Sequence, residues 1–167
     1  MMTTNPLYVN YISRFENKTV QSVLVDRINV VKKILEIVSA VDKWNYKYAE
    51  EKWSIKQVIQ HCIDCERIFS YRALHIARQD PNPLFGFDEN AYAAQATVIH
   101  KSGEALMYEY ILLMESIRLM YDGFEEVDLQ KTGVIATNQI SVGDIGFVIG
   151  GHSLHHMDVI LDRYLKE

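Results

Sequence analysis

Apolar residues recur every three or four positions along four long stretches of the chain. These stretches cover residues 19–41, 54–80, about 102–121, and a last one that begins at Ser141 or Asp144 and reaches about residue 166. This spacing places the apolar side chains on one face of an α-helix. Four amphipathic helices with modest connections predict an all-α four-helix bundle, in which metal sites form from side chains on facing helices.

Signals at the helix ends and between the helices add detail to this bundle. Residues 54–57 (Ser-Ile-Lys-Gln) form a capping box, and Pro81 ends the second helix. The loop at residues 80–88 is longer than a bundle connection needs, so we expect either a functional cover or a plain connector there. A short helix or turn is expected at residues 6–13. A small hairpin or an extended loop is expected at residues 132–140, before the last helix.

The composition fits a single domain over residues 1–167. Hydrophobic residues make up 49% of the chain and charged residues 23%, as in a globular protein with a sizeable core. The net charge of −5 and the scattered Lys and Arg residues argue against nucleic acid as a partner. No apolar run is long enough to span a membrane, and residues 1–8 lack the pattern of a signal peptide. A cytoplasmic location is therefore expected.

The candidate chemistry centres on histidine. His152 and His156 are four residues apart in the last predicted helix, so both imidazoles lie on one face and can bind the same divalent ion. His61, in the second predicted helix, can complete a three-histidine set that leaves one coordination position open, as catalytic sites do. His155 and His152 form a competing pair, but His155 points about a quarter turn away from His156.

Neighbours of these histidines have two interpretations each. Gly150 and Gly151 directly precede His152, and a glycine inside a helix costs about 1 kcal/mol relative to alanine. That cost favours close approach of another segment over a simple kink. Asp64 and Asp158 are the nearby carboxylates that can accept a hydrogen bond from the second ring nitrogen of a metal-binding histidine and so orient it. Each can equally be a solvated surface charge.

The two cysteines, Cys62 and Cys65, have a C-x-x-C spacing inside a helical pattern without strands. This context favours core residues over a redox pair. Cys65 is also four residues from His61, on the same helical face. A closed structural site with three imidazoles and one thiolate is therefore the alternative to the open site.

Seven short segments spread over most of the chain form a specific combination. They are KWSIKQVIQH at residues 52–61, DCERIF at 64–69, YRA at 71–73, ARQD at 77–80, PLFGFDEN at 83–90, IGGHSLHH at 149–156 and DRYL at 162–165. Together they resemble the DinB/YfiT-like family of metal-binding four-helix bundles. The resemblance implies that His61, His152 and His156 bind a divalent ion, typically zinc or nickel, and that the chain forms a homodimer. Cys65 departs from the family pattern, in which a small hydroxyl residue is expected.

The resemblance also implies a function, because characterised relatives include transferases of low-molecular-weight thiols. We expect a metal-dependent enzyme that transfers such a thiol, as co-substrate, to an electrophilic small molecule. Hydrolysis by metal-bound water and a non-catalytic, metal-stabilised binding or scaffold module are the alternatives. No general base is identified. The side chains expected to line the pocket are Trp53, Tyr71, Arg72, Phe85, Phe87 and Tyr92.

Overall fold

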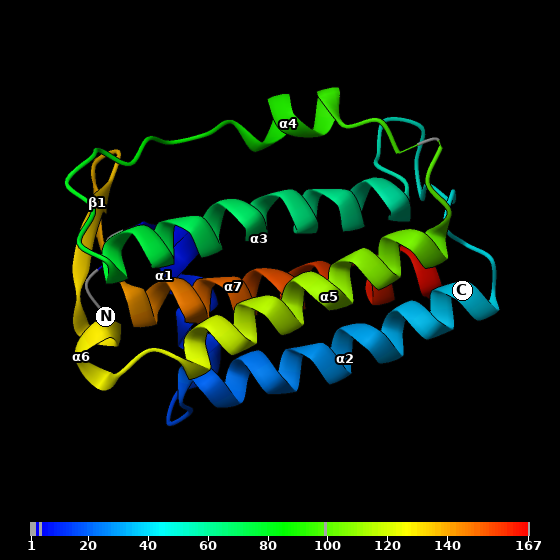
Figure 1. Ribbon diagram of the computed structural model, residues 1–167. Helices are drawn as coiled ribbons and strands as arrows, with labels where there is room; N and C mark the ends of the chain where they lie inside the picture. The colour runs from blue at the N-terminus through cyan, green and yellow to red at the C-terminus, as the bar shows by residue number, and fades with distance from the viewer. Residues whose placement is uncertain (1–2, 4, 99, 167) are drawn as a thin grey trace.

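Four long helices build the structure, as the apolar spacing predicts. In the computed structural model, which describes residues 3, 5–98 and 100–166, they are α2 (Val20–Ala40), α3 (Ile55–Ala77), α5 (Gly103–Asp122) and α7 (Val142–Val159). α2 and α3 each pack against both α5 and α7. α2 and α7 run in one direction, and α3 and α5 run in the other (Figure 1). The predicted four-helix bundle is confirmed.

Each long helix begins directly after a hydroxyl residue. The side chains of Thr19, Ser54, Ser102 and Ser141 accept backbone N–H groups of the first turn, which have no partner within the helix. The predicted capping box is complete, because the side chain of Gln57 accepts the backbone N–H of Ser54 at 2.9 Å. The last helix starts after Ser141, the earlier of its two predicted start points.

A long crossover joins α3 to α5 because these two helices run in the same direction. Residues 78–98 travel back along the outside of α3 and include a short helix, α4 (Glu89–Gln95) (Figure 1). Asp88 caps α4 by accepting two N–H groups of its first turn. The loop predicted at residues 80–88 is therefore the first part of a longer crossover, and α4 was not predicted.

A two-stranded hairpin lies at the end of the bundle where α3 ends. Its strands, β1 (Thr132–Ile135) and β2 (Asn138–Ser141), pair antiparallel with Thr132 opposite Ser141. Leu84 of the crossover forms a parallel bridge to Ile135, which ties the crossover to the hairpin. The hairpin is the first of the two alternatives expected at residues 132–140, whereas the short helix that leads into it, α6 (Glu126–Gln130), was not predicted.

The two terminal segments complete the architecture. α1 (Pro6–Ile12) confirms the short helix expected at residues 6–13, continues as a 3-10 turn at Ser13–Phe15, and packs against α7. At the other end, α7 continues without interruption into a π-helical segment, Ile160–Leu165. The last helical stretch therefore ends close to the predicted residue 166.

An ion pair is buried among the four long helices. Arg27 of α2 and Glu66 of α3 are both fully buried, and Arg27 Nη1 donates to Glu66 Oε2 at 2.7 Å. Tyr110 of α5 and Ser153 of α7 donate their hydroxyl groups to Glu66 Oε1, each at 2.6 Å. Arg27 also donates to Ser153 Oγ at 2.9 Å. One hydrogen-bonded cluster thus joins all four long helices.

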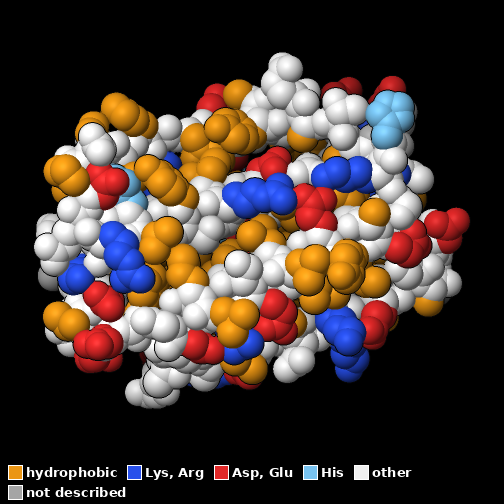
Figure 2. All heavy atoms as spheres, in the orientation of Figure 1, with side chains coloured by type: hydrophobic (Ala, Val, Ile, Leu, Met, Phe, Trp, Pro, Cys, Tyr) orange, Lys and Arg blue, Asp and Glu red, His pale blue; other side chains and the backbone are white. Residues whose placement is uncertain are grey.

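Charges of both signs are mixed on the face of the molecule that Figure 2 draws. Figure 2 shows Lys and Arg side chains beside Asp and Glu side chains on one face, with apolar side chains between them. Arg67 and Lys101, for example, both pair with Glu109 at 2.8 Å. No helix in the described part of the chain combines the length and the apolar character that a membrane span requires.

The buried ion pair generates a first prediction, on stability. Arg27→Met or Glu66→Leu should each lower the free energy of unfolding by about 3–5 kcal/mol, because each leaves an unpaired charge in the core. The double variant should lose clearly less than the sum of the two, since it leaves no isolated charge. Chemical denaturation measures all three values. Asp26→Asn, which breaks the exposed pair with Lys18, is the matched control and should lose much less. If the loss in the double variant equals the sum of the two single losses, Arg27 and Glu66 are not energetically coupled and the prediction is wrong.

Candidate metal centre

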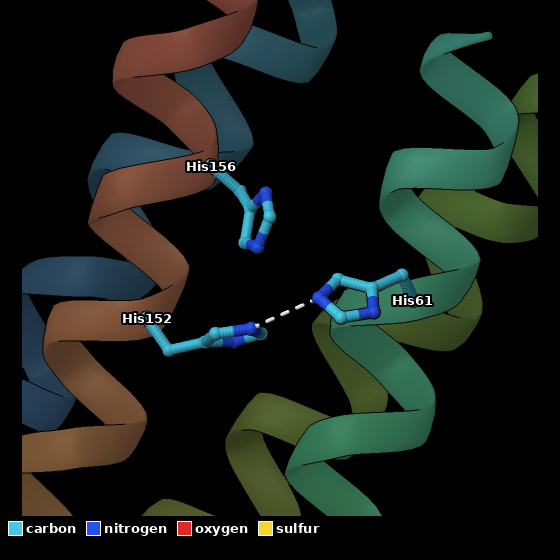
Figure 3. A group of neighbouring side chains, drawn as sticks. All are labelled: His61, His152 and His156. Carbon is cyan, nitrogen blue, oxygen red and sulfur yellow. Dashed lines mark hydrogen bonds between the residues drawn. The ribbon is translucent and has the colours of Figure 1, made fainter. Parts of the chain in front are cut away.

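Three imidazoles meet between α3 and α7. His61 lies in the second turn of α3, and His152 and His156 lie on successive turns of α7, which runs antiparallel beside it (Figure 3). One ring nitrogen from each histidine lies within 4.8 Å of the other two. The Nε2 atoms of His61 and His152 are 3.2 Å apart. The structure therefore brings together the three histidines that the sequence singles out.

One of the three nitrogen–nitrogen separations matches the spacing of two ligands around a divalent ion, and all three lie within 4.8 Å. Zinc–nitrogen bonds of about 2.0–2.1 Å in a tetrahedral arrangement place two ligand nitrogens about 3.3 Å apart. The separation of 3.2 Å between the Nε2 atoms of His61 and His152 agrees with this value. His155 is exposed and is not part of the group, so the i,i+4 pair on α7 is the one that faces His61.

Burial keeps the three imidazoles neutral. It lowers the pKa of His152 well below its usual value, and the neighbouring His156 and His61 lower it further. Burial, followed by the charges of His61 and His155, lowers the pKa of His156 to about 3. Burial also lowers the pKa of His61. A neutral imidazole offers a lone pair to a metal ion, whereas a protonated one cannot bind it.

A cavity of about 490 Å³ opens beside the imidazoles. Aromatic rings form much of its wall. Between ring centroids, Trp53 lies 5.1 Å from His61, and Tyr11 and Phe69 lie 6.0 Å and 5.8 Å from His152. A cavity of this volume and lining is of the size that holds a small molecule.

Known proteins share the sequence pattern and the fold. Residues 25–160 match the sequence model of the DinB superfamily. The chain belongs to the DinB superfamily. Its fold is similar to that of YfiT from Bacillus subtilis, described as a probable metal-dependent hydrolase with an unusual four-helix bundle topology; the TM-score is 0.66, over 83% of this chain and 84% of that one. At 14% sequence identity this likeness concerns the fold alone. Among curated proteins, none matches the chain.

Half of the predicted pocket residues of this DinB superfamily member lie at the cavity. Trp53, Arg72 and Phe87 line it. The other three side chains are largely exposed and do not line it: Tyr71 at 59%, Phe85 at 75% and Tyr92 at 50%. Tyr71 instead packs against His75, and Tyr92 packs against Phe87. Phe85 and Tyr92 belong to the crossover, whose path over α3 no local pattern in the sequence reveals.

Several residues that line the cavity were not predicted. Phe69 lies eight residues after His61, about two turns along the same face of α3, so the spacing alone could have identified it. Tyr8 and Tyr11 come from α1, and Glu89 comes from α4. Their positions depend on where these short helices dock, which is a long-range property of the fold.

Cys65 lies beside the imidazoles without joining them. Its Sγ atom is 3.6 Å from Nδ1 and 3.7 Å from Nε2 of His61, and among the described residues the group that can share one ion contains only the three histidines. Burial, followed by the charge of Glu89, raises the pKa of Cys65 to about 12, so its thiol is neutral. Cys62 and Cys65 are both buried and free, as expected of core residues. The arrangement favours the open set of three imidazoles over the closed alternative.

The two acidic residues predicted to orient the imidazoles have other partners. Asp158 pairs with Arg14 at 2.8 Å, and Asp64 accepts a hydrogen bond from Gln60 at 2.9 Å. The charge of Asp64 still raises the pKa of His61 against the larger, opposite effect of burial. His152 Nδ1 is buried and has no hydrogen-bond partner among the described residues. No described hydrogen bond joins either carboxylate to an imidazole.

The glycine pair before His152 allows two segments to approach α7 closely, as the sequence predicts. A Cβ atom on Gly150 would lie 2.4 Å from Cγ1 of Val23 on α2. A Cβ atom on Gly151 would lie 2.5 Å from the Cβ and 2.8 Å from the Cα of Tyr11 on α1. α1 is thereby seated on the turn that carries His152, and this contact places the ring of Tyr11 against the imidazole.

This contact predicts that Gly151→Ala destabilises the fold. Alanine favours a helix by about 1 kcal/mol relative to glycine, but the clash with the Tyr11 backbone should outweigh this gain and cost about 1–3 kcal/mol net. Gly123→Ala is the control, because a Cβ there would meet its nearest atom at 3.5 Å. Thermal unfolding of both variants provides the comparison. A Gly151→Ala protein at least as stable as the wild type would show that α1 does not pack here.

The lowered histidine pKa values predict a pH-dependent stability of the metal-free protein. Below pH 6.5 the unfolded chain binds protons that the folded state excludes, so stability is greatest above pH 6.5 and falls as the pH drops toward the folded pKa, about 3 for His156. The loss approaches about 1.4 kcal/mol per pH unit for each buried imidazole. Chemical denaturation of the protein in the presence of a chelator, at pH 7.5 and at pH 5.5, measures this loss of stability. His156→Gln should reduce the loss of stability, whereas His100→Gln, at an exposed position, should not. Equal losses in the two variants would contradict the assignment.

Proposed function

We propose that this protein is a metal-dependent enzyme that acts on a small molecule. The observation that carries the proposal is the convergence of three neutral imidazoles at the wall of a cavity of about 490 Å³. Structural metal sites are usually closed by four protein ligands, whereas His61, His152 and His156 leave a position for a further ligand. Zinc and nickel are the metals that best suit three imidazoles.

The reaction that we favour is the transfer of a low-molecular-weight thiol to an electrophilic small molecule. A divalent ion bound here would lower the pKa of a thiol and hold it in its nucleophilic thiolate form. His61, His152 and His156 would hold the ion. The rings of Trp53 and Phe69 would limit the access of water to the nucleophile. The resemblance of the sequence to the DinB/YfiT-like family, whose characterised relatives include transferases of this kind, supports this reaction.

Hydrolysis is the second candidate, because a carboxylate lies in the same cavity. Glu89 lines the cavity, and its charge acts on both Tyr11 and Cys65. A carboxylate so placed can accept a proton from an attacking water molecule. The description of YfiT as a probable metal-dependent hydrolase supports the same reaction. The two candidates share the three histidines and differ in whether a thiol is required.

Metal analysis combined with turnover tests the proposal. Reconstituted with zinc or nickel, the protein should hold about one ion per chain, and His61→Ala and His152→Ala should lose most of it because two imidazoles bind far more weakly than three. His155→Ala is the control and should keep the ion, since its exposed ring lies outside the group. Elemental analysis of the desalted proteins gives the metal content.

The same preparations separate the reactions. A test electrophile such as 1-chloro-2,4-dinitrobenzene is offered with glutathione, bacillithiol or mycothiol, and p-nitrophenyl acetate is offered without a thiol. Metal-dependent turnover that requires a thiol supports transfer, and turnover without one supports hydrolysis. Bound metal with neither rate above that of His152→Ala would favour the non-catalytic module. Light scattering of the same samples tests the homodimer that the family resemblance implies.

A further inference from the structure

A buried cation shares the cavity with the three imidazoles. Arg72 lies eleven residues after His61 on α3, which is about three turns, or about 16 Å along the helix axis, and therefore on the same face. Cys65 and Phe69 occupy the turns between them, and all four residues line the cavity. The cavity thus extends along α3 from the candidate metal centre to a guanidinium group.

The surroundings of Arg72 are aromatic rather than acidic. The residue is 3% exposed, and its guanidinium carbon lies 6.0 Å from the ring centre of Phe69 and 5.3 Å from that of Phe87. A carboxylate lies within 4.0 Å of four other arginines, but none of the described carboxylates lies that close to Arg72. A buried charge is normally paired, because its removal from water is costly.

Arg72 also retains hydrogen-bonding capacity. Its Nη2 atom donates to the carbonyl oxygen of Phe85 at 2.6 Å. Tyr8 lines the same cavity, and its ring centre lies 6.3 Å from that of Phe69, the ring that Arg72 also contacts. A guanidinium has five N–H donors in a planar fork, and a neutral phenol has one O–H donor. These contacts leave donors of both side chains for a ligand in the cavity.

We propose that Arg72 and Tyr8 form a subsite for an oxyanion, a carboxylate or phosphate group carried by the substrate or the co-substrate. The planar fork of arginine pairs with two oxygens of either group, and the aromatic walls keep water from competing. The proposal rests on the proposed function in one respect, because it requires the reacting end of the same molecule to reach the three imidazoles. Phe69 then lies beside the middle of the bound molecule.

Glu89 provides an internal comparison. It is the carboxylate that lines this cavity, and its charge acts on Tyr8 and Tyr11. An anion bound beside Tyr8 is therefore repelled by Glu89. Neutralising Glu89 should tighten the binding of an anion, whereas neutralising Arg72 should weaken it.

The structural alternative is that Arg72 only anchors the crossover through the Phe85 carbonyl. That role would affect stability but would give no saturable anion binding. Arg72→Lys keeps a positive charge and one donor for Phe85, but it removes the planar fork. Arg67 offers the matched control on the same helix, because it is exposed, pairs with Glu109 and does not line the cavity.

The test is a titration of the full-length protein with acetate and with inorganic phosphate at constant ionic strength, with chloride as the reference anion. Binding is followed by the NMR resonance of the Arg72 Nε–H group and by calorimetry, on zinc-loaded wild type and on metal-free His152→Ala. Saturable binding of at least one oxyanion to both proteins is expected, since the subsite does not need the metal. Which of the two binds more tightly separates a carboxylate from a phosphate ligand.

The variants then decide between the two roles of Arg72. Arg72→Met should lower the affinity for the oxyanion by roughly tenfold or more, and Arg72→Lys should lower it by several-fold. Arg67→Met should leave this affinity unchanged. Glu89→Gln should tighten it. If Arg72→Met does not fold, Arg72→Lys and Glu89→Gln carry the test.

Three outcomes would overturn the subsite. They are no saturable binding of either oxyanion, equal affinities in the Arg72 variants and the wild type, and binding that disappears in His152→Ala but persists in Arg72→Lys. The last result would place the anion on the metal and leave the proposed function intact. If the metal-loaded protein shows no turnover but oxyanion binding still depends on Arg72, the proposed function is rejected and the oxyanion subsite stands.

Discussion

The structure depends on the buried ion pair between Arg27 and Glu66. Because Glu66 also accepts hydrogen bonds from Tyr110 and Ser153, a single carboxylate fixes the relative positions of α2, α3, α5 and α7. Two of these residues adjoin the candidate site, since Glu66 follows Cys65 and Ser153 follows His152. Hydrogen bonds are directional, whereas apolar contacts permit sliding, so the cluster sets the register that brings His61 opposite the histidines of α7.

Around this fixed bundle, short segments supply the chemical environment. α1 approaches α7 at the glycine pair and brings Tyr11 against His152, and the crossover brings Phe87 and Glu89 over α3. The same burial that makes the cavity aromatic lowers the pKa values of the imidazoles and raises that of the Cys65 thiol. One end of the cavity therefore holds three neutral imidazoles that can bind a metal ion, and the other holds the guanidinium of Arg72, which has no carboxylate partner among the described residues.

The helices and the metal candidates could be predicted from the sequence because both depend on local periodicity. Apolar spacing located the four long helices, the i,i+4 rule paired His152 with His156, and the tandem glycines indicated a close approach. α4, α6 and the partners of Arg27 were not predictable in this way, because they depend on contacts between residues distant in the sequence. The path of the crossover, which leaves Phe85 and Tyr92 outside the lining of the cavity, depends on such contacts as well, and Tyr71 lies on an exposed part of α3 outside the same lining.

The central claim is that three imidazoles, and no sulfur, hold a metal ion with a position left open. X-ray absorption at the zinc edge of the reconstituted protein tests it directly. The account predicts three imidazole nitrogens at about 2.0–2.1 Å, one further light-atom ligand, and no zinc–sulfur distance near 2.3 Å. A sulfur ligand would mean that Cys65 closes the site, as in structural zinc centres, and would contradict the account, as would a spectrum without imidazole scattering.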